Sequence, residues 1–172
     1  MNSHLDKVRQ KIWNLDQLNS NLEHWKLAKE KIVFTNGCFD ILHLGHLSYL
    51  MQAADLGTKL IIGLNSDQSV RNQEKSPERP ILDQNSRAIA LASLSYIDAV
   101  VVFETDTPLE LIRKVEPDIL VKGADYNPAS DDPNDKAYIV GSKEVKELDG
   151  EIRVVPLLEG YSTTSIVNRI KA

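Results

Sequence analysis

The sequence predicts an α/β fold built on a five-stranded parallel sheet flanked by helices, and three observations indicate this class. Short runs of β-branched and other apolar residues alternate with helical patterns through most of the chain. The runs are almost continuously apolar, which is typical of strands buried on both faces of a parallel sheet. Distinctive polar residues directly follow the predicted strands, at the edge where such sheets bind their ligands.

The first 30 residues precede this alternation and predict a helical extension. Their apolar residues recur at the three- or four-residue spacing of an amphipathic helix: Leu5, Val8, Ile12, Leu15, Leu18, Leu22 and Trp25. We expect one or two helices here, packed on a single compact domain formed by residues 31–172. A separate interaction arm is the alternative. The total length of 172 residues is ordinary for one domain.

The elements of the domain follow in order. The predicted strands are Lys31–Asn36, Lys59–Asn65, Ala99–Phe103, Asp118–Lys122 and Glu151–Pro156. The predicted helices are His46–Leu56, Gln84–Leu94, a helix that starts within Thr107–Glu110, Lys143–Leu148 and Thr164–Lys171. Asp83 is expected to cap the second helix, and Thr107-Pro108-Leu109-Glu110 has the pattern of a capping box. Right-handed crossovers then connect the parallel strands.

Two longer irregular stretches remain, residues 73–82 and 127–136. The first holds Lys75 and Arg79, and the second holds two prolines and three aspartates. Loops of this length beside a site often serve as lids or substrate contacts. Plain solvated connections are an equally good interpretation of the second stretch.

Composition excludes several classes of protein. The net charge is −5 and no Lys/Arg stripe occurs, so we expect neither nucleic acid nor an anionic membrane as a partner. Cys38 is the only cysteine, which rules out an intrachain disulfide. No signal-peptide core and no 18-residue apolar run are present, so we expect a cytoplasmic protein.

His43 and His46 lie three residues apart around Gly45, just after the first predicted strand, and admit three interpretations. A zinc site with Cys38 and Asp40 matches none of the common ligand spacings. Two core histidines would be unusual beside a glycine at a strand end. A phosphate site explains more residues together, because the imidazoles face one side of a helix start whose free N–H groups attract anions. Gly45 and the nearby Gly37 would let the backbone approach the ligand.

His43-Leu44-Gly45-His46, after Gly37-Cys38-Phe39-Asp40, resembles the HxGH signature of the nucleotidyltransferase superfamily. Within it, the chain is most similar to the heptose 1-phosphate adenylyltransferase family. The motifs found in that family's order are Thr35–Asp40, Asn65-Ser66-Asp67, Arg79-Pro80, Lys122–Tyr126, Ile139–Val145 and Gly160–Thr164. The similarity covers about residues 31–171. It implies a Rossmann-like nucleotidyltransferase fold, in the stand-alone form rather than the form fused to a sugar kinase.

The resemblance implies a specific reaction. AMP would pass from ATP to D-glycero-β-D-manno-heptose 1-phosphate, giving ADP-heptose and pyrophosphate for lipopolysaccharide core precursor synthesis. The sugar phosphate would attack the α-phosphate directly and in line, with Mg²⁺ as the cofactor of ATP. No nucleophile from the protein is needed, and the sequence offers no obvious nucleophile–base pair. Related enzymes commonly form homodimers, so a homodimer is expected.

The resemblance also assigns roles to individual residues. It implies that His43, His46 and Lys122 are catalytic and stabilise charge at the α-phosphate. Nucleotide binding is implied for Asn36, Gly37, Phe39, Asp40, Gly45, Gly123, Asp125, Tyr126, Ser162, Thr163 and Thr164. Substrate binding is implied for Asn65, Asp67, Arg79 and Arg87.

Three of these assignments have a second interpretation. No protein ligand of a metal is assigned, but Asp40 could place a metal or simply order its loop. Ser162–Thr164 could be an ordinary helix cap as well as a phosphate grip. Lys122 could be a surface lysine that ends a strand.

The chain departs from the family pattern in three places. It lacks the usual lysine-glycine pair before Arg79, so that Lys75 is the candidate to replace it. It has KGADY where the family has KGGDY, and residues 129–137 look like an insertion.

Two rival functions remain. The first is a glycerol-3-phosphate-type cytidylyltransferase or another nucleotidyltransferase of a small phosphorylated substrate. The glycerol-3-phosphate type would carry arginines at the positions of Ser95 and Leu157, and both are missing. A non-catalytic nucleotide-binding protein would have no reason to retain the full set of polar motifs.

Overall fold

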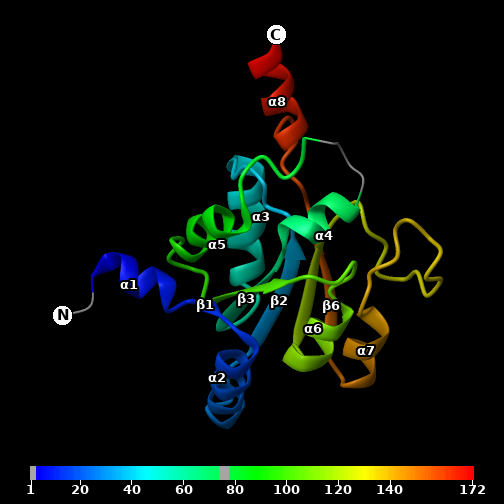
Figure 1. The fold of residues 1–172 in the computed structure, drawn as a ribbon. Coiled ribbons are helices and arrows are strands. Elements are labelled where there is room, and N and C mark those ends of the chain that lie inside the picture. The colour runs from blue at the N-terminus through cyan, green and yellow to red at the C-terminus, as the bar shows by residue number, and fades with distance from the viewer. Residues whose placement is uncertain (1–2, 74–77) are drawn as a thin grey trace.

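The sheet at the centre of the molecule is entirely parallel. The structure is a computed structural model that describes residues 3–73 and 78–172. In these residues six strands pair in the order β1-β4-β3-β2-β5-β6, all parallel (Figure 1). Their bounds are β1 Ile12–Trp13, β2 Ile32–Gly37, β3 Lys59–Asn65, β4 Ala99–Phe103, β5 Ile119–Gly123 and β6 Glu151–Val155. The predicted class, an α/β fold with helices around a parallel sheet, is confirmed.

Helices cover both faces of this sheet. Their bounds are α1 His4–Arg9, α2 Leu15–Leu27, α3 Leu44–Ala54, α4 Asp67–Asn72, α5 Gln84–Ala92, α6 Leu109–Val115, α7 Ser142–Glu147 and α8 Thr163–Lys171. Core residues of α3 and α5 share one apolar cluster, and core residues of α2, α6 and α7 share a second. Strand β2 separates the two clusters, because Val33 belongs to the first while Ile32 and Phe34 belong to the second. This is the two-residue alternation of a strand that is covered on both faces.

The predicted number of five strands is one too few. The five predicted strands are all present, each within one residue of the expected ends. The sixth is β1, inside the segment that was expected to be only helical. The Val100 amide donates to the Lys11 carbonyl at 2.8 Å, and Ile12 lies in register with Val100. Helical periodicity is broken here because Asn14 caps α2, with Gln17 completing a capping box.

Two expectations for the helices are also corrected. Helix α4 is not among the predicted elements; Ser66 caps it by accepting a hydrogen bond from the Ser69 amide. The capping box expected at residues 107–110 is absent, because Pro108 is the N-cap of α6 and no side chain caps that helix. With proline as the N-cap, α6 lacks the capping hydrogen bond that the Thr107 side chain was expected to accept.

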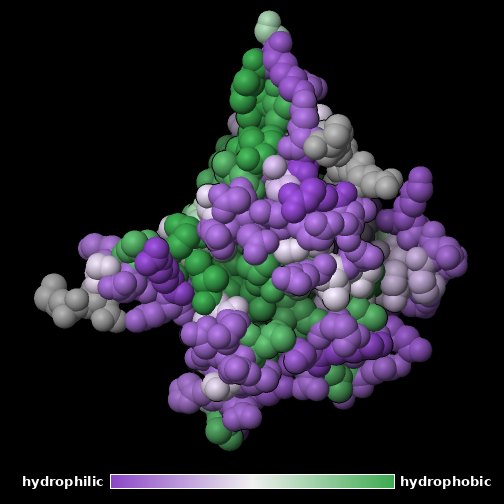
Figure 2. Space-filling model, viewed as in Figure 1, coloured by the Kyte–Doolittle hydropathy of each residue, from purple (hydrophilic) through white to green (hydrophobic). Residues whose placement is uncertain are grey.

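Helix α8 stands away from the body of the molecule, at the top of Figure 1. Figure 2 shows apolar surface along one side of it, and Ile170 near its end is 76% exposed. No helix in the part of the chain that the structure describes combines the length and apolar character needed to cross a membrane.

Candidate functional site

A cavity of about 350 Å³ opens at the carboxyl ends of β2 and β5. These two strands are neighbours, but the chain reaches β3 and β4 on one side of β2 and β5 on the other. This is the point where strand order reverses, which is where open parallel sheets bind ligands. The cavity is lined by Asn36, Gly37, Cys38, Phe39, His43, Gly45, His46, Tyr49, Arg79, Lys122, Gly123, Asp125, Tyr126, Leu157, Leu158, Tyr161, Ser162, Thr163 and Thr164.

The two histidines lie side by side at the start of α3. His43 is the N-cap of the helix, and its Nδ1 accepts a hydrogen bond from the His46 amide at 3.3 Å. The two rings stack, with centroids 3.8 Å apart and planes inclined by 18°. Because both rings line the cavity, they can act on the same ligand. Capping by His43 also explains why α3 begins at Leu44, two residues before the predicted start.

Hydrogen bonds assign a different tautomer to each ring. Nδ1 of His43 accepts a hydrogen bond, so in the neutral ring the proton is on Nε2 and that nitrogen is a donor. Nδ1 of His46 lies 3.1 Å from the Ile41 carbonyl oxygen, which only accepts, so this nitrogen carries the proton. Neutral His46 therefore has a bare Nε2 and can donate through it only when protonated.

Burial keeps both imidazoles neutral near pH 7. It lowers the pKa of His43 below its usual value of 6.5. It lowers the pKa of His46 to about 4, and the neighbouring His43 adds to this effect. A bound polyanion would act in the opposite direction, because negative charge nearby favours the imidazolium form.

Two glycines make room for this arrangement. A Cβ on Gly45 would lie 3.0 Å from the His43 ring and 3.1 Å from Cβ of Tyr161. A Cβ on Gly37 would lie 3.0 Å from the Phe39 ring. Gly45 thus lets the last loop of the chain approach the histidine turn closely.

Phe39 connects the strand end with the second histidine. Its backbone has a φ of +44°, a left-handed conformation that costs a bulky side chain about 1–2 kcal/mol. Its ring is buried and meets the His46 ring edge-on, with centroids 5.3 Å apart. The strained turn therefore places an aromatic wall against the imidazole.

Lys122 reaches the cavity from the end of β5. It is 7% exposed, which excludes the interpretation as a surface lysine. Its Nζ donates to Oδ1 of Asn36 on the adjacent strand and lies 5.4 Å from the centroid of the Tyr126 ring. The ammonium is therefore positioned between two strands at the floor of the cavity.

The start of α8 forms the opposite wall. Ser162 is the N-cap, and its hydroxyl accepts from the Ser165 amide at 3.0 Å. Arg79 donates through Nη2 to Oγ1 of Thr164 at 3.2 Å, which brings a cation to this wall. A helix start with hydroxyls and an adjacent guanidinium is a suitable site for phosphate oxygens.

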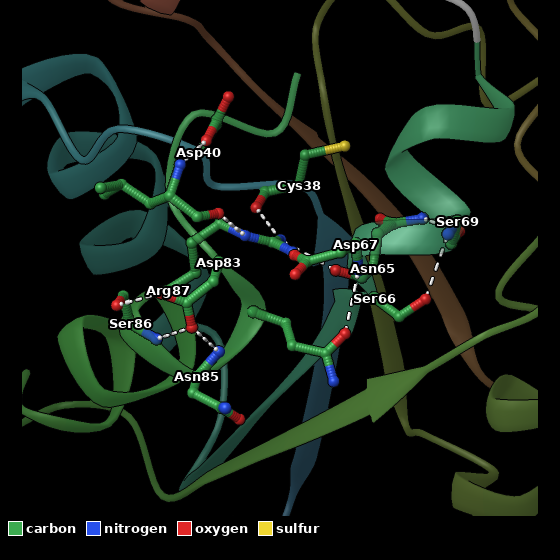
Figure 3. Close-up of polar contacts among 12 residues, drawn as sticks. Cys38, Asp40, Asn65, Ser66, Asp67, Ser69, Asp83, Asn85, Ser86 and Arg87 are labelled. Carbon is green, nitrogen blue, oxygen red and sulfur yellow. Dashed lines mark hydrogen bonds and ion pairs between the residues drawn. The ribbon is translucent and has the colours of Figure 1, made fainter. Parts of the chain in front are cut away.

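Four of the predicted site residues do not line the cavity. Asn65, Asp67 and Arg87, expected to bind substrate, form a buried network behind it together with Asp40 (Figure 3). Asp40 accepts hydrogen bonds through Oδ1 from the amides of Ile81 and Leu82, at 2.8 and 3.0 Å. This is the loop-ordering interpretation of that residue. Lys75, the candidate replacement for the family's lysine, lies outside the described residues.

No protein-built metal centre is found in residues 3–73 and 78–172, where no three His, Cys, Asp or Glu side chains gather as a set of ligands. Asp125 is the one carboxylate among the described residues of the cavity lining. The zinc interpretation of the histidine pair gains no support from this geometry. A metal carried by a polyanionic ligand remains compatible with it.

Sequence reasoning missed several residues of the lining. Tyr49 follows His46 by three positions on α3, and its hydroxyl donates to the Val121 carbonyl at 3.1 Å while it contacts Thr35. Burial raises the pKa of the Tyr49 phenol. Its spacing from His46 is a signal that could have identified it. The apolar loop residues Leu157 and Leu158 carry no such signal.

The arrangement is suited to a polyphosphate. Two imidazoles, an ammonium, a guanidinium and a helix start converge on one cavity, against a single carboxylate among the described lining residues. Nothing in this set is an activated nucleophile. The chemistry it supports is the positioning and charge stabilisation of a reacting phosphate.

Comparisons with known proteins agree with this picture. The family model described as "Cytidylyltransferase-like" matches residues 34–169. Two curated proteins named bifunctional protein HldE are 47% and 51% identical to the chain: that of Magnetococcus marinus over 94% of the chain and that of Helicobacter pylori strain Shi470 over 97%. The chain spans 31% and 33% of their lengths, so it matches about a third of each.

Solved structures extend the comparison. A lipopolysaccharide core biosynthesis protein from Thermoplasma volcanium GSS1 is 28% identical, with a TM-score of 0.58 over 77% of this chain and 99% of that one. A pantoate-beta-alanine ligase from Francisella tularensis has a TM-score of 0.59 over 93% of this chain and 76% of that one. At 15% identity, the second likeness concerns the fold alone.

Proposed function

Because this chain belongs to the cytidylyltransferase-like family of nucleotidyltransferases, we propose that it transfers AMP from ATP to D-glycero-β-D-manno-heptose 1-phosphate. The products are ADP-heptose and pyrophosphate. The observation that carries this proposal is that the histidine pair of α3 and the hydroxyl-rich start of α8 line one cavity. They come from opposite ends of the domain, and a triphosphate is long enough to contact both.

Different cations and hydrogen-bond donors of the cavity bind different phosphates of the triphosphate. Ser162–Thr164 and Arg79 hold the β- and γ-phosphates at the start of α8. His43, His46 and Lys122 face the α-phosphate, where charge develops during transfer. The nucleoside rests against the ends of β2 and β5, with Asp125 and Tyr126 beside it. The contacts in support are the Arg79–Thr164 hydrogen bond and the stacked imidazoles.

The reaction needs no covalent intermediate with the protein. An oxygen of the sugar phosphate attacks the α-phosphorus in line, and the bond from that phosphorus to the bridging oxygen of the β-phosphate breaks. Pyrophosphate leaves with the electron pair. The attacking group is already an anion, so the protein contributes orientation and stabilisation of the negative charge that develops.

We propose that Mg²⁺ enters as part of the MgATP substrate. The described residues fit this better than a resident metal, because Asp125 is the one carboxylate among them in the cavity lining. Asp40 lies outside that lining and binds two backbone amides through Oδ1. The ion would be held mainly by phosphate oxygens and would neutralise their charge.

The sugar is inferred from likeness. The motif order resembles the heptose 1-phosphate adenylyltransferases, and the similar Thermoplasma volcanium protein is described as acting in lipopolysaccharide core biosynthesis. We propose the same role here, in the cytoplasm, where ATP is available. A homodimer is also proposed; the exposed apolar side of α8 supports it, and light scattering on the purified chain tests it.

The experiment is a matrix of nucleotides and phosphorylated acceptors, read as pyrophosphate release. ATP, CTP, GTP and UTP are each combined with heptose 1-phosphate, glucose 1-phosphate and glycerol 3-phosphate. ATP with heptose 1-phosphate is expected to be the fastest pair. CTP with glycerol 3-phosphate as the fastest pair would assign the cytidylyltransferase function instead, and nucleotide binding without release in any pair would indicate a non-catalytic protein.

A further inference from the structure

Arg87 has the most completely buried charged side chain in the described core, at 1% exposure. Its guanidinium donates to three backbone carbonyls, of which those of Cys38 and Asn65 are distant in sequence. Nε reaches Leu82 at 3.0 Å, and Nη1 reaches both Cys38 at 2.7 Å and Asn65 at 2.8 Å. Nη2 pairs with the Asp67 carboxylate at 2.7 Å, which balances the charge (Figure 3). One side chain thus joins the ends of β2 and β3 to the loop before α5.

The bond to Cys38 controls the backbone of the next residue. The Cys38 carbonyl belongs to the peptide unit that precedes Phe39, and rotation about φ of Phe39 swings that unit. Phe39 has a φ of +44°, so the peptide tends to relax away from this conformation. A guanidinium that holds the carbonyl opposes the rotation.

The position of the Phe39 ring affects the histidine pair because that ring contacts His46. Its ring lies over Gly37 and meets the His46 ring edge-on, with centroids 5.3 Å apart. The His46 ring is also stacked against the ring of His43. A relaxed Phe39 would remove one of the two walls that orient the imidazole.

The same network holds the segment that carries Arg79. Asp40 accepts hydrogen bonds from the amides of Ile81 and Leu82, while Arg87 donates through Nε to the Leu82 carbonyl. Both groups therefore restrain one short stretch from two sides. Arg79 precedes this stretch and reaches the start of α8.

We propose that Arg87 is a positioning residue for phosphoryl chemistry: it fixes the Cys38 carbonyl, and through Phe39 it orients His46 toward the reacting phosphate. The inference rests on the proposed nucleotidyl transfer for its kinetic consequence. The structural link from Arg87 to the His46 ring does not depend on that reaction. Arg87 itself lies outside the cavity lining and touches no substrate.

The test replaces the guanidinium without removing the charge. Arg87→Lys keeps a cation for Asp67 but cannot serve three carbonyls at once. Asp67→Asn is a milder partner variant that keeps an oxygen acceptor for Arg87. Arg113→Lys is the matched control, because Arg113 is an exposed arginine of α6 that pairs with Glu110 and Glu144.

Two readouts separate this proposal from the proposed function. The NMR chemical shifts and the pKa of His46 are measured without nucleotide. Both are expected to change in Arg87→Lys and to change less in Asp67→Asn. The pKa of His46 should rise toward its usual value as the Phe39 ring loosens. In the pyrophosphate assay, kcat is expected to fall about tenfold in Arg87→Lys, since small misplacements of reacting groups cost this much or more. The KM for the nucleotide is expected to change less.

A purely structural role gives another result. If the variants that fold keep the wild-type His46 signal and titration, the link is overturned, even where their melting temperatures fall. If His46 moves but kcat per folded molecule stays the same, the positioning role is overturned. An inactive wild-type protein would contradict the proposed function alone, because the His46 readout needs no turnover.

Discussion

At the scale of single residues, hydrogen bonds give the two imidazoles of the site, His43 and His46, different tautomers. His43 uses Nδ1 to cap α3 and so presents Nε2–H to the cavity, while His46 uses Nδ1–H on a carbonyl and presents a bare nitrogen. The neutral pair therefore offers one donor and one acceptor. A triphosphate would require protonation of His46 to gain the second donor.

Replacing His43 tests its role in stabilising charge. His43→Ala is expected to lower kcat by about 10²–10³, the scale for losing one donor to a developing oxyanion. The fold should survive, because the helix cap it provides is a single long hydrogen bond of 3.3 Å. Steady-state kinetics and a thermal melt measure the two effects. His24→Ala, at an exposed position of α2, is the control, and equal activity in both variants would contradict the assignment.

The partly buried imidazole of His46 predicts how stability depends on pH. The unfolded chain takes up a proton near pH 6.5, but the folded chain does so only near its pKa of about 4. The stability contributed by the neutral ring is therefore complete above pH 6.5 and is lost as the pH falls from 6.5 toward 4. Urea unfolding midpoints of the nucleotide-free protein at pH 7.5 and 5.0 measure this loss of stability.

His46→Gln should reduce this fall in stability, since glutamine does not titrate. His24→Gln should leave the fall unchanged, because its histidine is exposed on α2. The same pH dependence in wild type and His46→Gln would show that the ring is not desolvated in the folded chain.

At the scale of elements, the first turns of two helices provide much of the anion-binding surface of the site. Two helices, α3 and α8, present their first turns to one cavity, and both are capped by a residue that also lines it, His43 and Ser162. Free amides and the positive end of the helix dipole are then available at both ends of an elongated anion. Capping and ligand binding are thus compatible roles of the same side chains.

A charge change at the cap of α8 separates the two roles of Ser162. Ser162→Asp keeps a good N-cap, so the melting temperature should hold. Its carboxylate would face the triphosphate, so the KM for ATP should rise at least about tenfold by like-charge repulsion. Ser162→Ala is the matched neutral variant: it loses about 1 kcal/mol of cap stability but adds no charge. Equal KM values in both variants would mean that this helix start does not face the phosphates.

The elements that sequence reasoning found are those whose signal is local. Strand β3 was predicted with its bounds because a buried parallel strand is continuously apolar. Strand β1 has only two residues, too few for any period, and α4 is a short polar helix. Of the motif residues, Lys122 lies at the end of β5 and the histidines lie at the start of α3, and the structure brings all three together in one cavity. Arg87 was assigned to substrate because a pattern cannot reveal that its partners are carbonyls up to 49 positions away.

At the scale of the whole molecule, the segment before residue 31 is part of the sheet and of the core. Strand β1 extends the sheet beyond β4, and Trp13 packs in the same apolar cluster as Leu18 and Leu22 of α2. The ring of Trp13 also contacts Trp25, with centroids 5.0 Å apart. These contacts argue against a separate interaction arm.

A pair of leucines on α2 tests this integration. Leu18 has no exposed surface, whereas Leu27 is 84% exposed. Leu18→Ala should lower the free energy of unfolding by about 3 kcal/mol through the cavity it leaves, and Leu27→Ala should change it little. Urea unfolding measures both. The turnover of folded Leu18→Ala is expected to stay at the wild-type value, and equal stability of the two variants would indicate that the segment is only loosely attached.

The position of the single thiol in this chain has a practical consequence. Cys38 is the only cysteine of the sequence and it lines the cavity between Gly37 and Phe39. A maleimide dye would therefore label the molecule at one place, in the lining of the cavity where we propose that the nucleotide binds. Protection from such labelling by added nucleotide would give a titratable optical signal of occupancy that needs no turnover and no engineered handle.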